Sequence, residues 1–233
     1  MSELLEDEVA YAAGGEARVA VLACGAIARE VLAVISLNGW THVDVRCLPA
    51  RLHNTPGRIP DAVDAKLHEL TGRYERVFVA YADCGTAGEL DAVLERHGVE
   101  RLPGAHCYGF FAGNDAWQAM HDEEPGTFYL TDFLARHFDA LVWRGLRLDR
   151  HPELLSDIFG NYRRLVYLAQ TDDPALDERA REAAERIGVA FERVRTGYGE
   201  LRPALERFAG DVSPEGLSPG GHPSTGGGVV AGA

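Results

Sequence analysis

Three cysteines at the ends of predicted strands are the residues of this sequence best suited to chemistry. Cys24 and Cys84 each follow a short apolar run and precede a glycine, and Cys107 lies in a loop beside His106. A thiolate binds soft metal ions or acts as a nucleophile, and the free N–H groups at a helix start stabilise it. The sequence has no C-x-x-C pair, which excludes the zinc-ribbon, ferredoxin and thioredoxin motifs. Any shared site must therefore be assembled by the fold.

Several centres are compatible with three such thiols. A [4Fe–4S] cluster held by three cysteines leaves the fourth iron open to a small polar substrate, as a Lewis acid. A zinc ion leaves one position for water, His106 or a substrate thiol. A thiol nucleophile needs only one of the cysteines and no metal. We rank the cluster first and zinc second, and we expect the fourth cysteine, Cys47, to be a small buried hydrophobe within a strand.

Other polar residues also follow predicted strands. In open parallel sheets, ligands bind beyond the carboxyl ends of the strands. We predict that Asp83, Asp132 and Tyr198 are catalytic groups, although acidic residues at helix starts are also ordinary caps. The residues predicted to contact a cofactor or ligand are His53, Asn54, His106, Tyr108, Thr131, Gln170 and Asp172.

Alternating strands and helices would position these residues. The predicted strands are short apolar runs, and helical stretches with apolar residues at three- and four-residue spacing follow them. This alternation predicts an α/β fold with one or more mostly parallel sheets and flanking helices, arranged as two Rossmann-like lobes with a cleft between them. A helix is expected directly after Cys84, and residues 99–112 are expected to be irregular. The predicted strands are Val19–Cys24, Val43–Leu48, Arg76–Tyr81, Thr127–Thr131, Leu165–Ala169 and Ala190–Val194.

Composition divides the chain into three parts. Residues 1–16 form an acidic N-terminal segment, and residues 17–211 form the α/β core, with lobes over about 17–125 and 126–211. Residues 212–233 are rich in glycine and proline with little apolar surface to bury, which predicts a disordered tail.

Charge and hydropathy restrict the class of partner. The formal net charge is −13, which argues against nucleic acid and against an anionic membrane surface. No apolar run in the sequence approaches the length of a membrane-spanning helix, which needs about 20 residues. The N-terminus is acidic, unlike the start of a secretory signal. We therefore expect a cytoplasmic protein whose cysteines are thiols or metal ligands. A nicotinamide cofactor is not expected, because the turn after the first strand lacks the three-glycine fingerprint.

Several segments together resemble a known family. They are VAVLACGAIARE, LPARLHNTPGRIPDAV, VFVAYADCGTAGELDAVL, PGAHCYGFFAG, GTFYLTDFLARHFD and LVYLAQTDDP, and they resemble the bacterial and archaeal family named domain of unknown function 1638 over roughly residues 17–201. The cysteines of its ACG, DCG and HCY motifs match Cys24, Cys84 and Cys107. Family members are encoded beside corrinoid-dependent methyltransferases. The resemblance therefore implies a role in corrinoid-dependent C1 metabolism, either as an enzyme or as an accessory protein that binds a corrinoid protein or methyltransferase.

Overall fold

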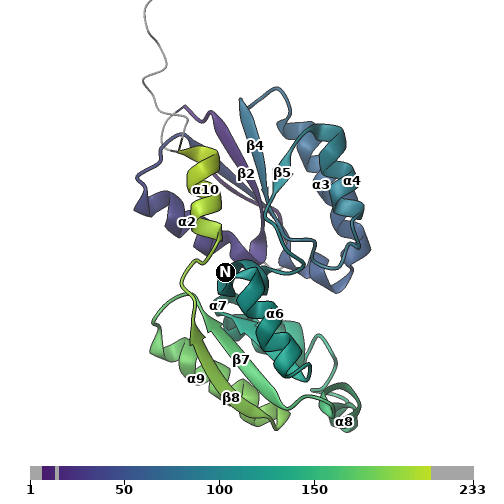
Figure 1. Cartoon of the computed structure of the whole chain (residues 1–233). Coiled ribbons are helices and arrows are strands. Elements are labelled where there is room, and N and C mark those ends of the chain that lie inside the picture. The colour runs from purple at the N-terminus through teal and green to yellow at the C-terminus, as the bar shows by residue number, and fades with distance from the viewer. Residues whose placement is uncertain (1–6, 14–15, 211–233) are drawn as a thin grey trace, which may run out of the picture.

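A computed structural model describes residues 7–13 and 16–210 of the chain, which form two sheets flanked by helices (Figure 1). The first sheet has the strand order β1-β3-β2-β4-β5. Strand β1 is antiparallel to β3, and the other neighbours are parallel. All six residues of β2 are buried, as an apolar strand at the centre of a covered sheet requires. The strands are β1 (Val9–Tyr11), β2 (Val19–Cys24), β3 (Val43–Leu48), β4 (Arg76–Ala80) and β5 (Glu100–Arg101).

Amphipathic helices cover this first sheet. Helix α3 (Ile59–Leu70) buries Ile59, Val63, Leu67 and Leu70, one stripe at helical spacing. The 3₁₀ turn η1 (Gly25–Ile27) leads from β2 into α2 (Ala28–Leu37). Two more turns, η2 (Ala50–Asn54) and η3 (Pro56–Arg58), lead from β3 into α3, and α4 (Glu89–His97) ends at Gly98 in the left-handed conformation.

The second sheet contains three parallel strands in the order β6-β7-β8, namely β6 (Thr127–Thr131), β7 (Arg164–Ala169) and β8 (Ala190–Arg195). Helices α7 (Asp132–Phe138), α8 (Leu155–Phe159) and α9 (Pro174–Ile187) share one apolar core with it. The π-helical turn η4 (Asp139–Trp143) continues α7, and the 3₁₀ turn η5 (Pro152–Leu154) precedes α8. Asp173 caps α9 as expected, since its side chain accepts a hydrogen bond from Ala175 N at 3.0 Å.

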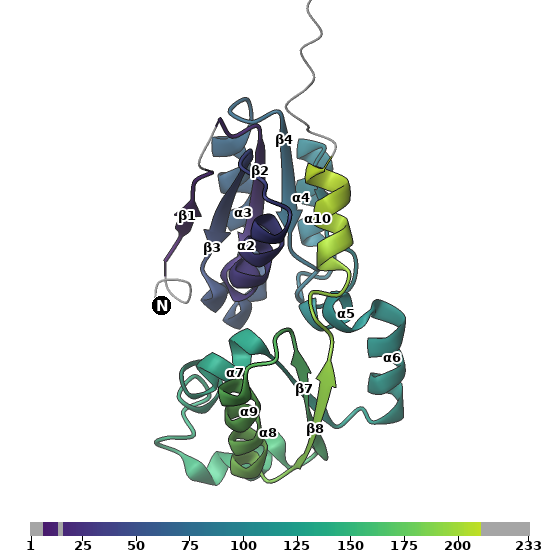
Figure 2. The same ribbon diagram turned by 90° about the vertical axis from the view of Figure 1, so that its left-hand side faces the viewer.

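Three helices join the two sheets. Helix α5 (Cys107–Ala112) places Phe110 and Phe111 in the first core, while α6 (Asn114–Glu123) lies beside the second sheet. Helix α10 (Leu201–Ala209) follows β8 and returns to the first sheet beside α2 (Figure 2). The ring of Phe208 in α10 lies 4.9 Å from that of Phe78 in β4. Residues 201–209 therefore complete the first lobe, although the sequence placed them in the second.

The α/β class, the mostly parallel sheets and their flanking helices are confirmed. The prediction that residues 99–112 are irregular is wrong, because β5 and α5 lie within them. The acidic N-terminal segment contains β1, and the predicted tail at residues 212–233 lies outside the described residues. No helix in the described part of the chain is both long enough and apolar enough to cross a lipid bilayer.

Candidate functional site

Cys24 ends the central strand β2 and caps the turn that follows it. Its Sγ accepts a hydrogen bond from Ala26 N at 3.3 Å. Burial raises the pKa of the Cys24 thiol to about 12, and the hydrogen bond from Ala26 lowers it by less. The stabilisation of the thiolate expected at a helix start is therefore outweighed by burial. Without a metal, Cys24 is a protonated thiol at neutral pH.

Cys84 lies in a constrained loop after β4. Helix α4 begins only at Glu89, so the prediction of a helix directly after Cys84 is wrong and the helix dipole does not act on this thiol. Cys84 has φ +54° and Gly85 has φ +84°. A left-handed conformation is costly for a residue other than glycine, and such strain gathers at functional sites.

Asp83 holds this loop in place. Its carboxylate accepts hydrogen bonds from the backbone N–H groups of Gly85, Ala87 and Gly88, at 2.9–3.2 Å, and from the hydroxyl of Thr86 at 2.8 Å. Burial would raise the pKa of Asp83, but these hydrogen bonds lower it overall. The visible role of Asp83 is to position Cys84, and its catalytic role stays a prediction.

Cys107 is the first residue of α5 and is only partly exposed. Helix α5 is anchored on both sides, because Phe110 and Phe111 lie in the first core while Tyr108 stacks on Tyr129 of β6 at 5.4 Å between ring centroids. Burial raises the pKa of the Cys107 thiol. The nearby thiols of Cys84 and Cys24 raise it further, so electrostatic effects link the three cysteines.

His53 and Tyr81 lie among these thiols. His53 Nδ1 is 3.7 Å from Cys24 Sγ and 3.1 Å from the carbonyl oxygen of Ala50. Burial alone would lower the pKa of His53, but hydrogen bonding to Cys84 raises it overall. The ring of Tyr81 is parallel to that of His53, 6.2 Å away. Its buried hydroxyl adjoins Cys24 and Cys84, yet it has no well-aligned hydrogen-bond partner in the described part of the chain.

A metal centre requires its ligand atoms to lie close together. Within residues 7–13 and 16–210, the three cysteines do not form a group whose ligand atoms all lie within 4.8 Å of one another. Tetrahedral zinc needs sulfurs about 3.8 Å apart, given a Zn–S bond of about 2.3 Å. Three thiolates on the corners of a cubane cluster lie roughly 6 Å apart. Both centres would require the three sulfurs to come together, and the choice between a cluster and zinc stays a prediction.

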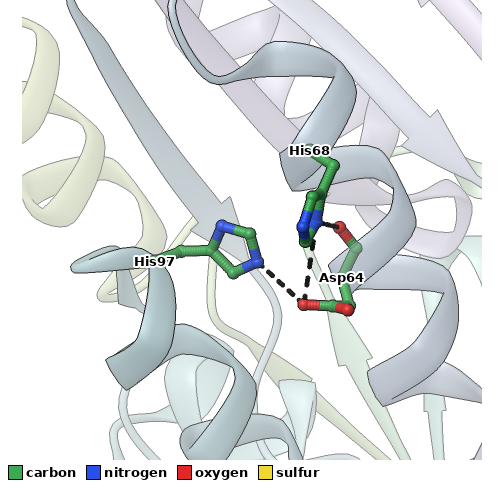
Figure 3. Close-up of side chains that lie close together, drawn as sticks. All are labelled: Asp64, His68 and His97. Atoms are coloured by element: carbon green, nitrogen blue, oxygen red, sulfur yellow. Dashed lines mark hydrogen bonds and ion pairs between the residues drawn. The ribbon is translucent and has the colours of Figure 1, made fainter.

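A different group does bring its ligand atoms within 4.8 Å of one another. Asp64 and His68 of α3 and His97 of α4 gather there (Figure 3). His97 Nε2 lies 2.7 Å from Asp64 Oδ1, and the His68 side chain is 69% exposed. The sequence analysis did not single out these residues. An ion pair on the surface explains the contacts, but the group could also bind a divalent ion in solution.

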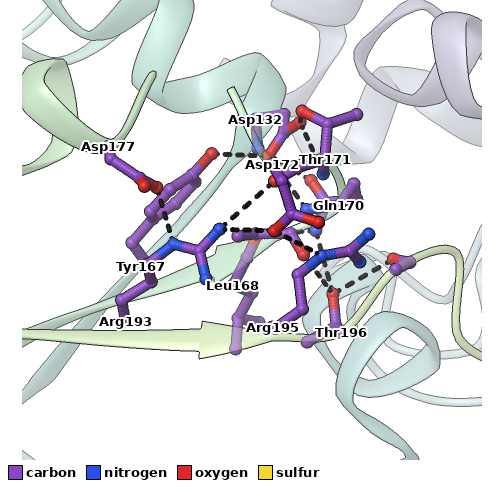
Figure 4. A network of polar contacts seen from close by, with 12 residues as sticks. Asp132, Tyr167, Leu168, Gln170, Thr171, Asp172, Asp177, Arg193, Arg195 and Thr196 are labelled. Carbon is purple, nitrogen blue, oxygen red and sulfur yellow. Dashed lines mark hydrogen bonds and ion pairs between the residues drawn. The ribbon is translucent and has the colours of Figure 1, made fainter. Parts of the chain in front are cut away.

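The carboxyl ends of β6 and β7 carry a second polar cluster, centred on Asp132 (Figure 4). The Asp132 carboxylate is 1% exposed and accepts hydrogen bonds from the Tyr167 hydroxyl at 2.7 Å and from Gln170 N at 2.9 Å. Thr171 donates to it twice, through its N–H and its hydroxyl. Two residues predicted at different strand ends, Asp132 and Gln170, are therefore in direct contact.

Other predicted residues at this edge have visible structural partners. Thr131 caps α7 by accepting a hydrogen bond from Leu134 N at 3.3 Å. The Asp172 carboxylate is exposed and accepts from Arg193 and Arg195, both at 2.9 Å, and these hydrogen bonds lower its pKa. These contacts account for Thr131 and Asp172 locally, and contact with a ligand stays a prediction for both.

The remaining predicted residues lie around the two clusters. Asn54 is exposed at the end of η2. His106 precedes α5, and its ring lies 5.9 Å from that of Trp117, but among the described residues no hydrogen bond joins it to a cysteine. Tyr198 is held close to α5 by its neighbour Gly199, which packs against the backbone of that helix. A Cβ added to Gly199 would lie 2.3 Å from the carbonyl oxygens of Phe110 and Phe111.

Sequence reasoning missed Glu30, which joins the two clusters electrostatically. It lies in α2 and interacts with Asp132 on one side and with Cys24 and Cys107 on the other. Burial raises its pKa from 4.5 to about 7. The helical spacing could have indicated that Glu30 is buried. It lies three residues after Ile27 and four before Val34, on the apolar face of the helix.

A family model matches a large part of the chain. Residues 47–205, more than half of the chain, match the family model described as protein of unknown function (DUF1638), which confirms the resemblance seen in the sequence motifs. The matched stretch contains Cys84 and Cys107 and begins after Cys24. No curated protein matches the chain.

Proposed function

The chain belongs to this family, and we propose that Cys24, Cys84 and Cys107 hold a [4Fe–4S] cluster whose open iron binds a small polar molecule. One observation carries the proposal. The three thiols come from distant parts of the chain, yet Cys24 and Cys84 both lie near enough to raise the pKa of Cys107 and that of Tyr81. When bound, the cluster would supply a Lewis acid.

The surroundings of the thiols support this proposal. Thiolate ligands of a cluster accept hydrogen bonds, and the unsatisfied hydroxyl of Tyr81 is a donor beside Cys24 and Cys84. His53 also adjoins these two sulfurs, with Nδ1 3.7 Å from Cys24 Sγ. Cys47 lies in β3 and is 2% exposed, with a thiol pKa that burial raises to about 12. It is a natural control, a buried cysteine to which the proposal gives no role.

The test is anaerobic reconstitution with iron and sulfide. The native chain should become brown, with absorbance near about 400 nm and about four irons per chain. Cys24→Ala, Cys84→Ala and Cys107→Ala should each lower the bound iron, whereas Cys47→Ala should keep it. An iron-free native chain after reconstitution, or full iron in the variant that lacks all three cysteines, would overturn the proposal.

Zinc binding is measured beside iron, because the surface group of Asp64, His68 and His97 can contribute a background. The same cysteine variants are therefore prepared with and without His97→Ala. Zinc that is lost with Cys24 and Cys84 but kept in His97→Ala would assign zinc to the thiols. Zinc lost only in His97→Ala belongs to the surface group.

A second candidate function is nucleophilic catalysis by Cys84 without metal. The positive φ of Cys84 in a turn after a strand and its electrostatic interaction with His53 favour this alternative. It predicts that alkylation of metal-free protein modifies Cys84 first and that His53→Ala slows this reaction. Equal loss of function on replacing each of the three cysteines would exclude it.

The accessory role implied by the family resemblance has a separate test. Purified chain is mixed with a corrinoid protein, and co-elution is measured before and after metal removal. Association that is unchanged in the variant without Cys24, Cys84 and Cys107 would favour a binding protein over an enzyme. Association that needs the three cysteines would connect the partner to the metal centre.

A further inference from the structure

Glu30 has a carboxylate oxygen that is buried without a partner. The side chain is 5% exposed, and Oε2 has no hydrogen-bond partner in the part of the chain that the structure describes. The neighbouring carboxylate of Asp132 accepts four hydrogen bonds from Tyr167, Gln170 and Thr171. Leaving a buried polar atom unsatisfied costs about 1–3 kcal/mol, so the contrast between the two carboxylates requires an explanation.

The unsatisfied oxygen belongs to a side chain that lines a hollow of about 210 Å³. At about 30 Å³ for each water, this is space for about seven waters or a small organic molecule. Four segments from both lobes surround it: α2, α7, the loop after β7 and the loop before α10. The lining residues are Arg29, Glu30, Ala33, Asp132, Arg136, Thr171 and Tyr198.

The charges around the hollow have a definite pattern. Glu30 is an acceptor that lacks a donor, while Arg29 and Arg136 place guanidinium groups on the lining and lower the pKa of Glu30. Guanidinium groups recognise carboxylates and other anions. A ligand suited to this lining carries a hydrogen-bond donor for Glu30 and an anionic group for the arginines.

We propose that this hollow binds a small zwitterionic molecule, whose protonated amine pairs with the Glu30 carboxylate and whose anionic group lies against Arg136. The proposal specifies the class of small polar molecule in the proposed function and builds on it, but the binding step needs no cluster. Binding is therefore measured on metal-free chain. Failure to load iron and failure to bind the zwitterion are then separate results.

Three probes separate the two halves of the ligand. Glycine carries an amine and a carboxylate, ethylamine carries the amine alone, and acetate carries the carboxylate alone. Ligand-observed NMR and calorimetry at pH 8 should show that glycine binds more tightly than either fragment. Glu30→Gln should weaken glycine at least tenfold and leave acetate unchanged, and Arg136→Gln should weaken glycine and acetate but not ethylamine. Glu178→Gln, an exposed change in α9, should alter none of them.

The pH dependence gives a second readout. The Glu30 carboxylate must be ionised to pair with an ammonium group, and its pKa is about 7. Glycine affinity should therefore fall as the pH drops below about 7, and it should lose this dependence in Glu30→Gln. Folded native chain that does not bind glycine, or glycine affinity that Glu30→Gln leaves unchanged, overturns the proposal. Glycine affinity that Arg136→Gln leaves unchanged overturns the anionic half of it.

Discussion

Replacing Glu30 with glutamine should stabilise the metal-free chain at pH 8 and have little effect near pH 4.5. Burial raises the pKa of Glu30 from 4.5 to about 7, so the folded state holds this proton more tightly than the unfolded state. The free energy of unfolding therefore falls as the pH rises from about 4.5 to about 7, because ionisation is easier in the unfolded chain. A rise of this size corresponds to about 3 kcal/mol, at about 1.4 kcal/mol for each pH unit.

The assay is urea unfolding of the native chain and of Glu30→Gln at several pH values. Other carboxylates titrate in both proteins, so the difference between the two isolates Glu30. We expect Glu30→Gln to be more stable by about 3 kcal/mol at pH 8, or roughly 6–12 °C in melting temperature. The difference should disappear near pH 4.5, and Glu178→Gln should show none at either pH.

Two results would refute this reasoning. A difference that does not vary with pH would show that Glu30 ionises normally in the folded chain. A loss of stability in Glu30→Gln at pH 8 would show that the ionised carboxylate already has good partners. The charged groups that could provide such compensation come from several elements around Glu30, namely Arg29, Cys24, Cys107, Asp132, Arg136 and Tyr198.

Three further variants, two of them paired with a control variant, test residues that shape the site. Gly199→Ala places a methyl group 2.3 Å from two carbonyl oxygens of α5 and should cost about 3 kcal/mol in urea unfolding, whereas Gly188→Ala meets no neighbour and should cost about 1 kcal/mol. Asp132→Asn should cost about 2–4 kcal/mol by disrupting a buried network, and the exposed Asp172→Asn should have a much smaller effect in the same assay. Asp83→Ala should release the loop that follows β4 and speed alkylation of its cysteine, measured by mass spectrometry.

Elements with a strong periodic signal could be predicted from the sequence. Strands β2, β3 and β6 have the predicted bounds because short apolar runs between turn residues leave few alternatives. Helix α5 was missed because its six residues include a glycine and three aromatics, a composition without helical preference. It forms because Phe110 and Phe111 bury themselves in the first core, and that packing depends on residues far away in the sequence.

The site was predictable to the extent that it follows strand order. Asp132 and Gln170 meet because β6 and β7 are parallel neighbours whose carboxyl ends lie together. The positive φ of Cys84 was not predictable, since Asp83 imposes the turn through four hydrogen bonds within the loop. The partners of Cys24 also needed the fold, because His53 lies 29 residues away in the chain.

Tyr81 offers a test in which the metal-free and metal-bound chains respond in opposite directions. In the metal-free chain its buried hydroxyl has no well-aligned partner among the described residues, and such a group costs about 1–3 kcal/mol. Tyr81→Phe removes the hydroxyl and keeps the ring that lies parallel to His53. We therefore expect the metal-free variant to be as stable as the native chain or about 1 kcal/mol more stable in urea.

With a cluster bound, the same hydroxyl would donate a hydrogen bond to a thiolate that carries negative charge, and such bonds are stronger than neutral ones. Tyr81→Phe should then speed cluster loss to a chelator several-fold, although it does not destabilise the metal-free chain. Cys47→Ala, a change elsewhere in the same core, should leave the rate of loss unchanged. Equal rates of cluster loss in the native chain and in Tyr81→Phe would show that this hydroxyl does not stabilise the metal centre. A Tyr81→Phe variant that is destabilised without metal would show that the hydroxyl already has a partner, because only a satisfied donor is costly to remove.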